Sequence, residues 1–491
     1  MAALRSAPAL RLARLAALPR RAPRCPATAK APPPPPPPFD SLDTFTDRHV
    51  GPDDHEASFM LSKPASWPPP SPQQSASPPP PSATSPCPPS ELHARAKALG
   101  SQNRKFKSCI GMGHHNAAVP PVILRSAMEN PAWYTPYTPY QPEVAQGRLE
   151  SLVNYQTMIA SLTGMDVANA SLLDETTAAA EGMAMSYAHS GQKRKSFFVD
   201  SAVLPQTIAA LRTRAKGSGI RPLVGDSRAA LEDPELRADL ADQVHASGAL
   251  VVCATDLLAL TLLTPPGEWG ADVVLENSAR FGVPAGYGGP HGAFFAVTDR
   301  LKRKMPGRLI GRSKDTVGSP AYRLALQTRE QHIRREKATS NICTSQALLA
   351  NMAAMYAVYH SPVGLTRIAE KIHLFAQLLH AGVGRVGFRV VNDAYFDTLT
   401  IDVSPVCKNA EAVHAAAALK SINLRRIDST RVGVTFDESV GYEGLETLVS
   451  VFSTTASGPT EVLASIPEPI AAALPSSLVR TSGFRVSNSC G

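Results

Sequence analysis

Two short apolar segments that end in polar residues are the places where this sequence could do chemistry. Leu250–Asp256 and Ala271–Leu275 are β-branched runs, typical of strands buried on both faces of a parallel sheet. Ligands of such sheets bind at the carboxyl ends of the strands. Asp256 stands at one of these ends, and a glycine-rich stretch, Arg280–His291, follows the second run. We therefore expect a ligand site beside Asp256.

The residue type that is missing here is equally informative. The loop after the second strand is where an enzyme that uses pyridoxal phosphate would carry its Schiff-base lysine. No lysine occurs from Gly217 through Leu301. The sequence therefore has the frame for pyridoxal phosphate without the residue that would hold this cofactor covalently.

Two other motifs carry weaker signals. His114 and His115 are adjacent, so their side chains project to different sides and make a poor pair of metal ligands. We therefore predict no metal site. The stretch Gly286–Gly292 is rich in glycine, but it contains a proline and does not open a helix, so it fails the structural context of a dinucleotide-binding loop.

The elements that position Asp256 alternate between strands and helices. A strand at Phe197–Asp200 precedes helices at Gln206–Ala215 and Ala229–His245, and the two apolar runs follow. This alternation predicts an α/β fold with a mainly parallel, doubly wound sheet. A helix at Gln346–Tyr359 then leads into a smaller C-terminal region that mixes strands and helices, which is the composition of an α+β domain.

Composition divides the chain into five regions. We predict a transit peptide over residues 1–30, a Pro-rich and largely disordered region over 31–90, and a large α/β domain over 91–360. A small α+β domain over 361–456 and an irregular tail over 457–491 follow.

The first region has the composition of a targeting segment. Residues 1–30 are rich in Arg, Ala and Leu, and the first acidic residue of the chain is Asp40. Arginines spaced among leucines form a basic amphipathic helix, as in organelle transit peptides. We expect import into the mitochondrial matrix, with plastid import as the competing interpretation.

Charge and cysteine usage exclude several classes. The formal net charge is +8, but six arginines lie in the first 24 residues, so the body is close to neutral and a nucleic-acid partner loses its main support. No apolar run approaches the length of a membrane span. The seven cysteines form no CxxC pair, which favours reduced thiols.

Nine motifs together identify a family. They run collinearly from about residue 109 to 480 and are Gly111–Asn116, Tyr137–Glu143, Gln146–Glu150, Asn169–Glu175, Cys253–Asp256, Arg280–Pro284, Gly286–His291, Leu326–His332 and Ala338–Thr344. These motifs resemble the P-protein of the glycine cleavage system, glycine dehydrogenase (aminomethyl-transferring, decarboxylating). The resemblance implies the fold of fold-type-I pyridoxal phosphate transferases.

The resemblance also implies how the site is divided between two homologous halves. Family members carry the halves in one chain or as two subunits, and the lysine belongs to the second half. This chain resembles the first half, and its position matching the lysine is Ala279 or Arg280. Asp256 matches the carboxylate that pairs with the pyridine nitrogen of the cofactor, and here it is either cofactor-binding or a structural relic. We expect no catalytic residue in this chain and no activity without a lysine-bearing half.

The implied reaction is the decarboxylation of glycine, with pyridoxal phosphate as the electron sink. The aminomethyl group then passes to the lipoyl group of the H-protein. The first half is expected to cover the active site of the second. The candidates for walling the glycine pocket are Tyr137, Thr138, Tyr140, Gln141, Asn341 and Cys343.

The chain departs from the family pattern between Val224 and Leu250, where it is too short for one strand and the loop after it. Two alternatives therefore stay open beside the catalytic component. The chain is a non-catalytic partner or regulatory subunit, or it is a truncated form.

Overall fold

The computed structural model describes residues 55, 89–135, 139, 141–227, 240–286, 288–326, 342, 346–407, 409–453, 458–466 and 474–487. The predicted transit peptide and nearly all of the predicted Pro-rich region lie outside these residues. The chain divides into two compact units, Met1–Gly100 and Ser101–Gly491. The first contains most of helix α3 (Pro89–Ser101), and every element described below belongs to the second.

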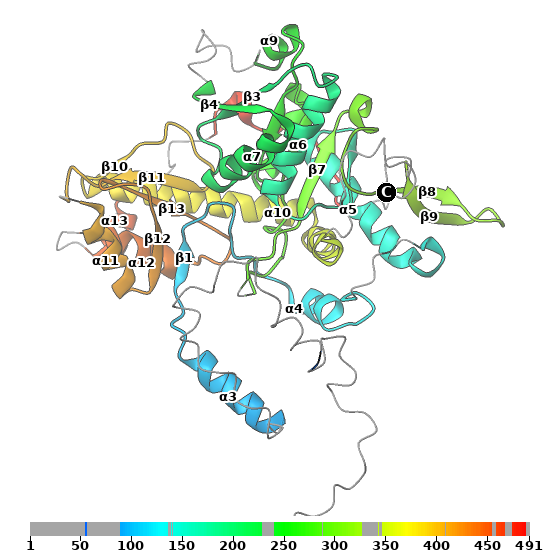
Figure 1. The fold of residues 1–491 in the computed structure, drawn as a ribbon. Helices are drawn as coiled ribbons and strands as arrows, with labels where there is room; N and C mark the ends of the chain where they lie inside the picture. Colours follow the sequence, from blue (N-terminus) through cyan, green and yellow to red (C-terminus); the bar gives the residue numbers. More distant parts are fainter. Residues whose placement is uncertain are drawn as a thin grey trace, which may run out of the picture. The chain divides into compact units, whose positions relative to one another are not determined.

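Four strands form a central sheet, in the order β2 (Val167–Ala168), β7 (Ala293–Val297), β6 (Val273–Asn277) and β5 (Val252–Ala254). β5 and β6 run parallel, whereas β7 is antiparallel to both of its neighbours. The predicted α/β class is confirmed (Figure 1). The central sheet itself is mixed rather than mainly parallel, because the chain turns back through the glycine-rich loop between β6 and β7.

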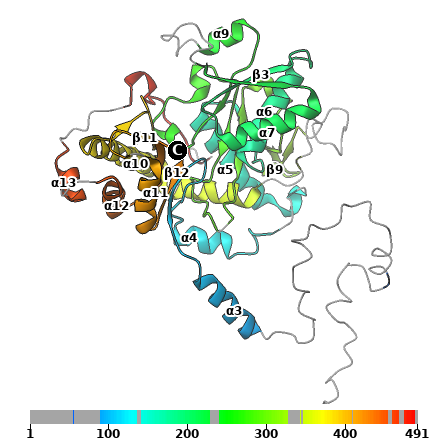
Figure 2. The same ribbon diagram turned by 60° about the vertical axis from the view of Figure 1, so that its left-hand side comes forward.

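Helices cover both faces of this sheet (Figure 2). Leu275 of β6 shares a core cluster with α6 (Glu175–His189), whereas its neighbour Val274 shares another with α5 (Gln146–Thr163) and α10 (Ala347–Arg385). Successive side chains of a strand point to opposite faces. The strand is therefore apolar at consecutive positions rather than at alternate ones, as the sequence shows.

A second parallel pair stands apart from the central sheet in its hydrogen bonding. β3 (Ser196–Asp200) pairs with β4 (Arg221–Gly225), and α7 (Pro205–Ser218) connects them. Among the described residues, no strand joins this pair to β5. Helix α9 (Leu240–Ala246) follows on the way to β5. Residues 228–239, between β4 and α9, lie outside the described residues, so the expectation that the chain is one strand short before Leu250 stays a prediction.

Five strands form a C-terminal sheet. Their order is β1 (Lys107–Cys109), β12 (Ile422–Arg426), β13 (Arg431–Thr435), β11 (Thr398–Asp402) and β10 (Arg389–Val390). β1 pairs in parallel with β12, although the sequence alone does not place residues 107–109 in this sheet. Helices α11 (Ala410–Leu419) and α12 (Tyr442–Phe452) pack beside it.

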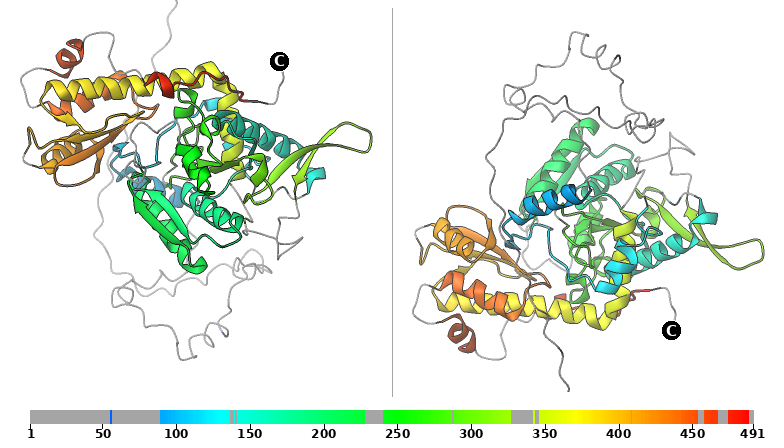
Figure 3. Two further views of the ribbon diagram at one scale, coloured as in Figure 1. Left: turned by 90° about the horizontal axis from the view of Figure 1, so that it is seen from above. Right: turned by 90° about the horizontal axis from the view of Figure 1, so that it is seen from below.

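Helix α10 contributes to the cores of both sheets (Figure 3). It continues past the predicted end at Tyr359, with a kink at Ser361, whose φ of 59° and ψ of 171° are not helical. Pro362 follows the kink, and proline can neither donate a helical hydrogen bond nor fit inside a straight helix. One kinked helix therefore reaches from the central sheet to the C-terminal sheet.

The remaining elements are short. β8 (Leu309–Lys314) and β9 (Pro320–Ala325) form an antiparallel hairpin. The short helices are α4 (Pro121–Ile123), η1 (Leu124–Met128), η2 (Pro142–Val144), η3 (Ala259–Thr261), η4 (Pro266–Trp269), η5 (Asp299–Leu301), α13 (Pro459–Ala464) and η8 (Ser476–Leu478). The last two lie within the predicted irregular tail. Within the described part of the chain, no helix combines the length and apolar character needed to cross a bilayer.

Candidate functional site

A cavity of about 420 Å³ lies at the carboxyl ends of β3, β5 and β6. This is where ligands bind in open α/β sheets. Its charged and titratable lining residues are His115, Glu175, Asp200, Asp256, Glu276 and Arg280. Four of these six residues carry carboxyl groups, which disfavours the binding of an anion in the cavity.

Asp256 stands two residues after β5 and holds the turn that follows. One carboxylate oxygen accepts the backbone N–H groups of Leu258 and Ala259 at 2.8 and 3.3 Å. The other accepts a hydrogen bond from Nε of Arg280 at 2.5 Å. Burial pushes the pKa of Asp256 upward, but Arg280, His115 and the two N–H donors together hold that pKa below its usual value. Asp256 is therefore ionised, and both of its carboxylate oxygens accept hydrogen bonds.

Arg280 is, with Ala279, one of the two positions predicted to match the Schiff-base lysine. Its side chain is only 5% exposed and also forms an ion pair with Asp397. A third contact runs from its Nη1 to the carbonyl oxygen of Phe436 at 3.4 Å. Its guanidinium lies 5.8 Å from the ring centroid of Phe396. A buried group that stays protonated at any physiological pH is therefore bonded to two carboxylates in the loop after β6.

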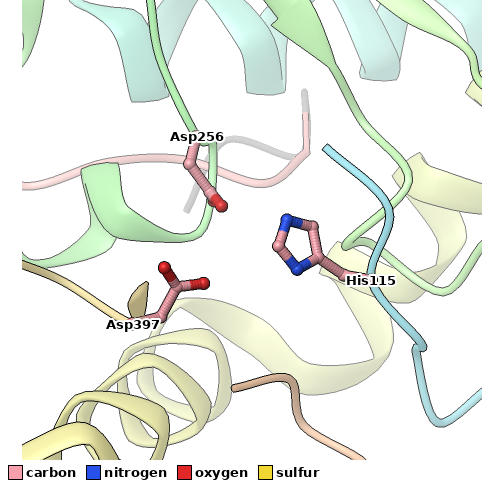
Figure 4. Close-up of side chains that lie close together, drawn as sticks. All are labelled: His115, Asp256 and Asp397. Carbon is pink, nitrogen blue, oxygen red and sulfur yellow. The ribbon is translucent and has the colours of Figure 1, made fainter. Parts of the chain in front are cut away.

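Asp256, Asp397 and His115 point toward one another (Figure 4). One ligand atom from each lies within 4.8 Å of the others, a spacing that could hold a metal ion. However, the guanidinium of Arg280 bonds both carboxylates. Burial, followed by the Arg280 charge, lowers the pKa of His115 to about 3. The arginine thus takes the place that a cation would need, and His115 is neutral.

The two adjacent histidines enter different surroundings, as expected. His114 turns away from the Arg280 cluster, and its Nδ1 lies 3.1 Å from Nε2 of His291. Nδ1 of His291 in turn lies 2.5 Å from a carboxylate oxygen of Glu175, which is 4% exposed. Sequence reasoning missed Glu175 and His291 as site residues. Their one signal was that both lie in family motifs.

Glu276 is a second acidic residue that sequence reasoning missed. It lies on β6 beside the cavity, and its carboxylate accepts a hydrogen bond from the Asn277 side chain at 3.2 Å. Burial raises the pKa of Glu276 to about 8, and the nearby charges of Glu175 and Asp256 add to this effect. Glu276 therefore keeps its proton near neutral pH.

The residues present do not fit pyridoxal phosphate. No lysine lies in the loop between β6 and β7, and the carboxylate of Asp256 is already bonded to Arg280. The N-terminus of α6, where a phosphate group could bind, begins with Asp174 and Glu175. Asp174 caps this helix by accepting the N–H of Thr177 at 2.7 Å. The cavity lacks the covalent anchor, a free carboxylate for the pyridine nitrogen, and an anion site.

The structure describes only one of the six residues predicted to wall the glycine pocket. Tyr137, Thr138, Tyr140, Asn341 and Cys343 lie outside the described residues. Gln141 is exposed just before η2 and does not line the cavity. Their proposed role stays a prediction.

A protein-family model described as glycine cleavage system P-protein matches residues 47–452. The chain is 48% identical over 469 residues to a glycine dehydrogenase (decarboxylating) of Bordetella avium (strain 197N). That match covers 90% of this chain and 48% of the other protein. The chain therefore spans about half the length of this curated relative.

A solved structure with the same family description also matches the chain. A crystal structure of glycine decarboxylase (P-protein) of the glycine cleavage system, in inhibitor-bound form, matches with a TM-score of 0.68 and 32% identity. The match covers 81% of this chain and 93% of that one. A sphingosine-1-phosphate lyase of Burkholderia pseudomallei matches with a TM-score of 0.51 and 14% identity, over 77% of this chain and 90% of that one. The latter shares the fold alone.

Proposed function

The chain belongs to the glycine cleavage system P-protein family, whose cofactor is pyridoxal phosphate, and we propose that it is the lysine-less half of a glycine decarboxylase. A lysine-bearing half then holds the cofactor and glycine, and lipoylated H-protein accepts the aminomethyl group. The observation that carries this proposal is that Arg280 follows β6 and bonds Asp256. The chain alone is then inactive.

The proposal assigns this sequence to one half of a P-protein. It matches 48% of a glycine dehydrogenase (decarboxylating) of the same family, and in this proposal the lysine lies in a part that the match does not cover. Because the cavity in this chain does not suit the cofactor, the contribution to catalysis comes from the surface that meets the other half. The chain supplies structure around an active site that it does not contain.

We place the Tyr137–Gln141 segment at that surface, with Asn341 and Cys343 as further candidates. Prolines stiffen the segment, so its side chains can wall a pocket without a large loss of conformational entropy. Changing Tyr137 and Tyr140 to Phe should raise the KM for glycine of the assembled enzyme. Unchanged kinetics would remove these residues from the pocket.

Residues 1–30 direct the chain to the mitochondrial matrix in this proposal, since they are basic and contain no acidic residue. A fluorescent protein fused to residues 1–30 should enter mitochondria. Plastid accumulation would favour the competing interpretation.

The proposed function is tested by reconstitution. Purified chain, a purified lysine-bearing half and their mixture are each supplied with pyridoxal phosphate, lipoylated H-protein and carboxyl-labelled glycine. We expect labelled carbon dioxide from the mixture alone. The matched control is a lysine-bearing half with its Schiff-base lysine changed to alanine, which should bind this chain without turnover.

The same assay separates the alternatives. Binding of the two intact halves without labelled carbon dioxide would identify a non-catalytic partner or regulatory subunit. A chain that neither binds nor activates the other half would contradict both interpretations.

A further inference from the structure

One buried side chain connects the two sheets at the place where a cofactor would bind. Arg280 follows β6 of the central sheet, and its partner Asp256 follows β5. Its other partners, Asp397 and the carbonyl of Phe436, lie next to β11 and β13 of the C-terminal sheet. A single guanidinium therefore bonds strand ends from both sheets.

The geometry uses what distinguishes arginine from lysine. A guanidinium presents five N–H donors in a fixed planar fork, so it can bond two carboxylates and a carbonyl at once. The Asp397 carboxylate also accepts the hydroxyl of Thr398, and the backbone carbonyl of Asp397 accepts the N–H of Phe436. These contacts tie the Arg280 network into the backbone of the C-terminal sheet.

The same bonds exclude the cofactor. A protonated pyridine nitrogen would need the Asp256 carboxylate, and that oxygen already accepts Nε of Arg280. The side chain of Arg280 cannot form an imine. A cation supplied by the protein thus stands against the carboxylate that a bound cofactor would otherwise neutralise.

We propose that Arg280 takes the place of the cofactor and clamps the C-terminal sheet to the central sheet. This half therefore keeps the two sheets together without a ligand. The inference goes beyond the proposed function and concerns the isolated chain. Its tests measure stability and exchange, not decarboxylation, so either idea can fail alone.

The first test removes the cation. In Arg280→Met, the carboxylates of Asp256 and Asp397 lose the cation that pairs them, and the melting temperature near pH 8 should fall by roughly 5–10 °C. His114, His115, Glu276 and Asp437 are the other titratable groups around this cluster, and none of them supplies a replacement cation near pH 8, since burial is the first cause that lowers the pKa of both histidines.

The pH dependence separates a lost clamp from lost packing. Buried carboxylates without a cation have raised pKa values, so they take up protons on acidification and stop opposing folding. The deficit of Arg280→Met relative to the wild type should therefore shrink by at least about half between pH 8 and pH 5. A deficit that stays constant over this range would mean that only packing was lost, and would overturn the proposal.

Two further variants keep the test decisive if Arg280→Met does not fold. The triple variant Asp256→Asn, Arg280→Met, Asp397→Asn removes all three charges of this cluster, and it should recover most of the lost melting temperature. A triple variant as unstable as the single one would refute the clamp. Arg431→Met is the control, because it breaks a half-exposed ion pair between Arg431 of β13 and Asp428. It should change the melting temperature by less than about 2 °C.

Two readouts test the clamp itself. Amide hydrogen exchange in β11 and β13 should speed up in Arg280→Met more than exchange in β6 and β7 does. Millimolar pyridoxal phosphate should leave the melting temperature of the wild type unchanged, because a ligand that does not bind cannot stabilise the fold. Faster exchange confined to the loop after β6, or a saturable rise in melting temperature with the cofactor, would contradict the proposal.

Discussion

Glu276 allows a direct test of the acidic character of the cavity. The wild-type side chain carries a proton in the folded state up to a pKa of about 8, compared with an ordinary value of 4.5. Folding must therefore hold a proton that the unfolded chain has lost over much of the neutral range. Glu276→Gln replaces the carboxyl group with a neutral group of the same shape, which removes this requirement.

The sign and the magnitude follow from linkage. A raised carboxyl pKa means that the folded state loses stability as pH rises from the unfolded value to the folded one. A difference from 4.5 to about 8 corresponds to at most about 5 kcal/mol, and water that reaches the cavity lowers the expected effect to roughly 1–3 kcal/mol. Glu276→Gln should thus be more stable than the wild type near pH 8.5, with a much smaller difference near pH 5.

Urea unfolding followed by circular dichroism measures this difference directly. The wild type and Glu276→Gln are unfolded at several pH values between about 5 and 8.5, and their unfolding free energies are compared. Glu129→Gln, at an exposed position, is the control and should show no comparable trend. Parallel pH profiles for the wild type and Glu276→Gln would refute the reasoning.

Two more predictions concern the frame of the site. Gly282 has φ of +74°, and a Cβ there would lie 2.5 Å from the Tyr356 ring, so Gly282→Ala should lower the unfolding free energy by about 2–4 kcal/mol in chemical denaturation. Gly217→Ala, in α7 with open space around it, should instead be neutral or slightly stabilising. Burial raises the pKa of the Cys109 thiol to about 12, so iodoacetamide near pH 8 should not modify it until the chain unfolds, whereas the partly exposed Cys407 should be labelled. Rapid labelling of Cys109 in the folded protein would contradict its placement.

The framework of the fold could be read from the sequence where burial makes a pattern unambiguous. The runs that became β5 and β6 are short, β-branched and bounded by turn residues, so strands were predicted there. β7 was missed, since its five buried residues, Ala293–Val297, carry neither the period of a half-buried strand nor that of a helix. The continuation of α10 beyond Tyr359 was missed, because Pro362 indicates the end of a helix and local sequence does not show that the helix resumes after the kink at Ser361.

The site could be predicted only as far as local sequence allows. Asp256 was found because it ends a buried strand, and the absence of a lysine was visible directly. The pairing of Arg280 with Asp397 was not, because it joins positions in different sheets that are 117 residues apart. The chain of Glu175, His291 and His114 depends in the same way on loops that meet only in the folded protein.

The central claim is that this chain lacks the anchor for the cofactor and leaves that role to another half. The most direct measurement is borohydride reduction of the assembled enzyme with pyridoxal phosphate, followed by mass mapping of both halves. We predict one stoichiometric pyridoxyl-lysine in the lysine-bearing half and none at saturable occupancy in this chain. A stoichiometric pyridoxyl-lysine within residues 101–491 of this chain would contradict the account.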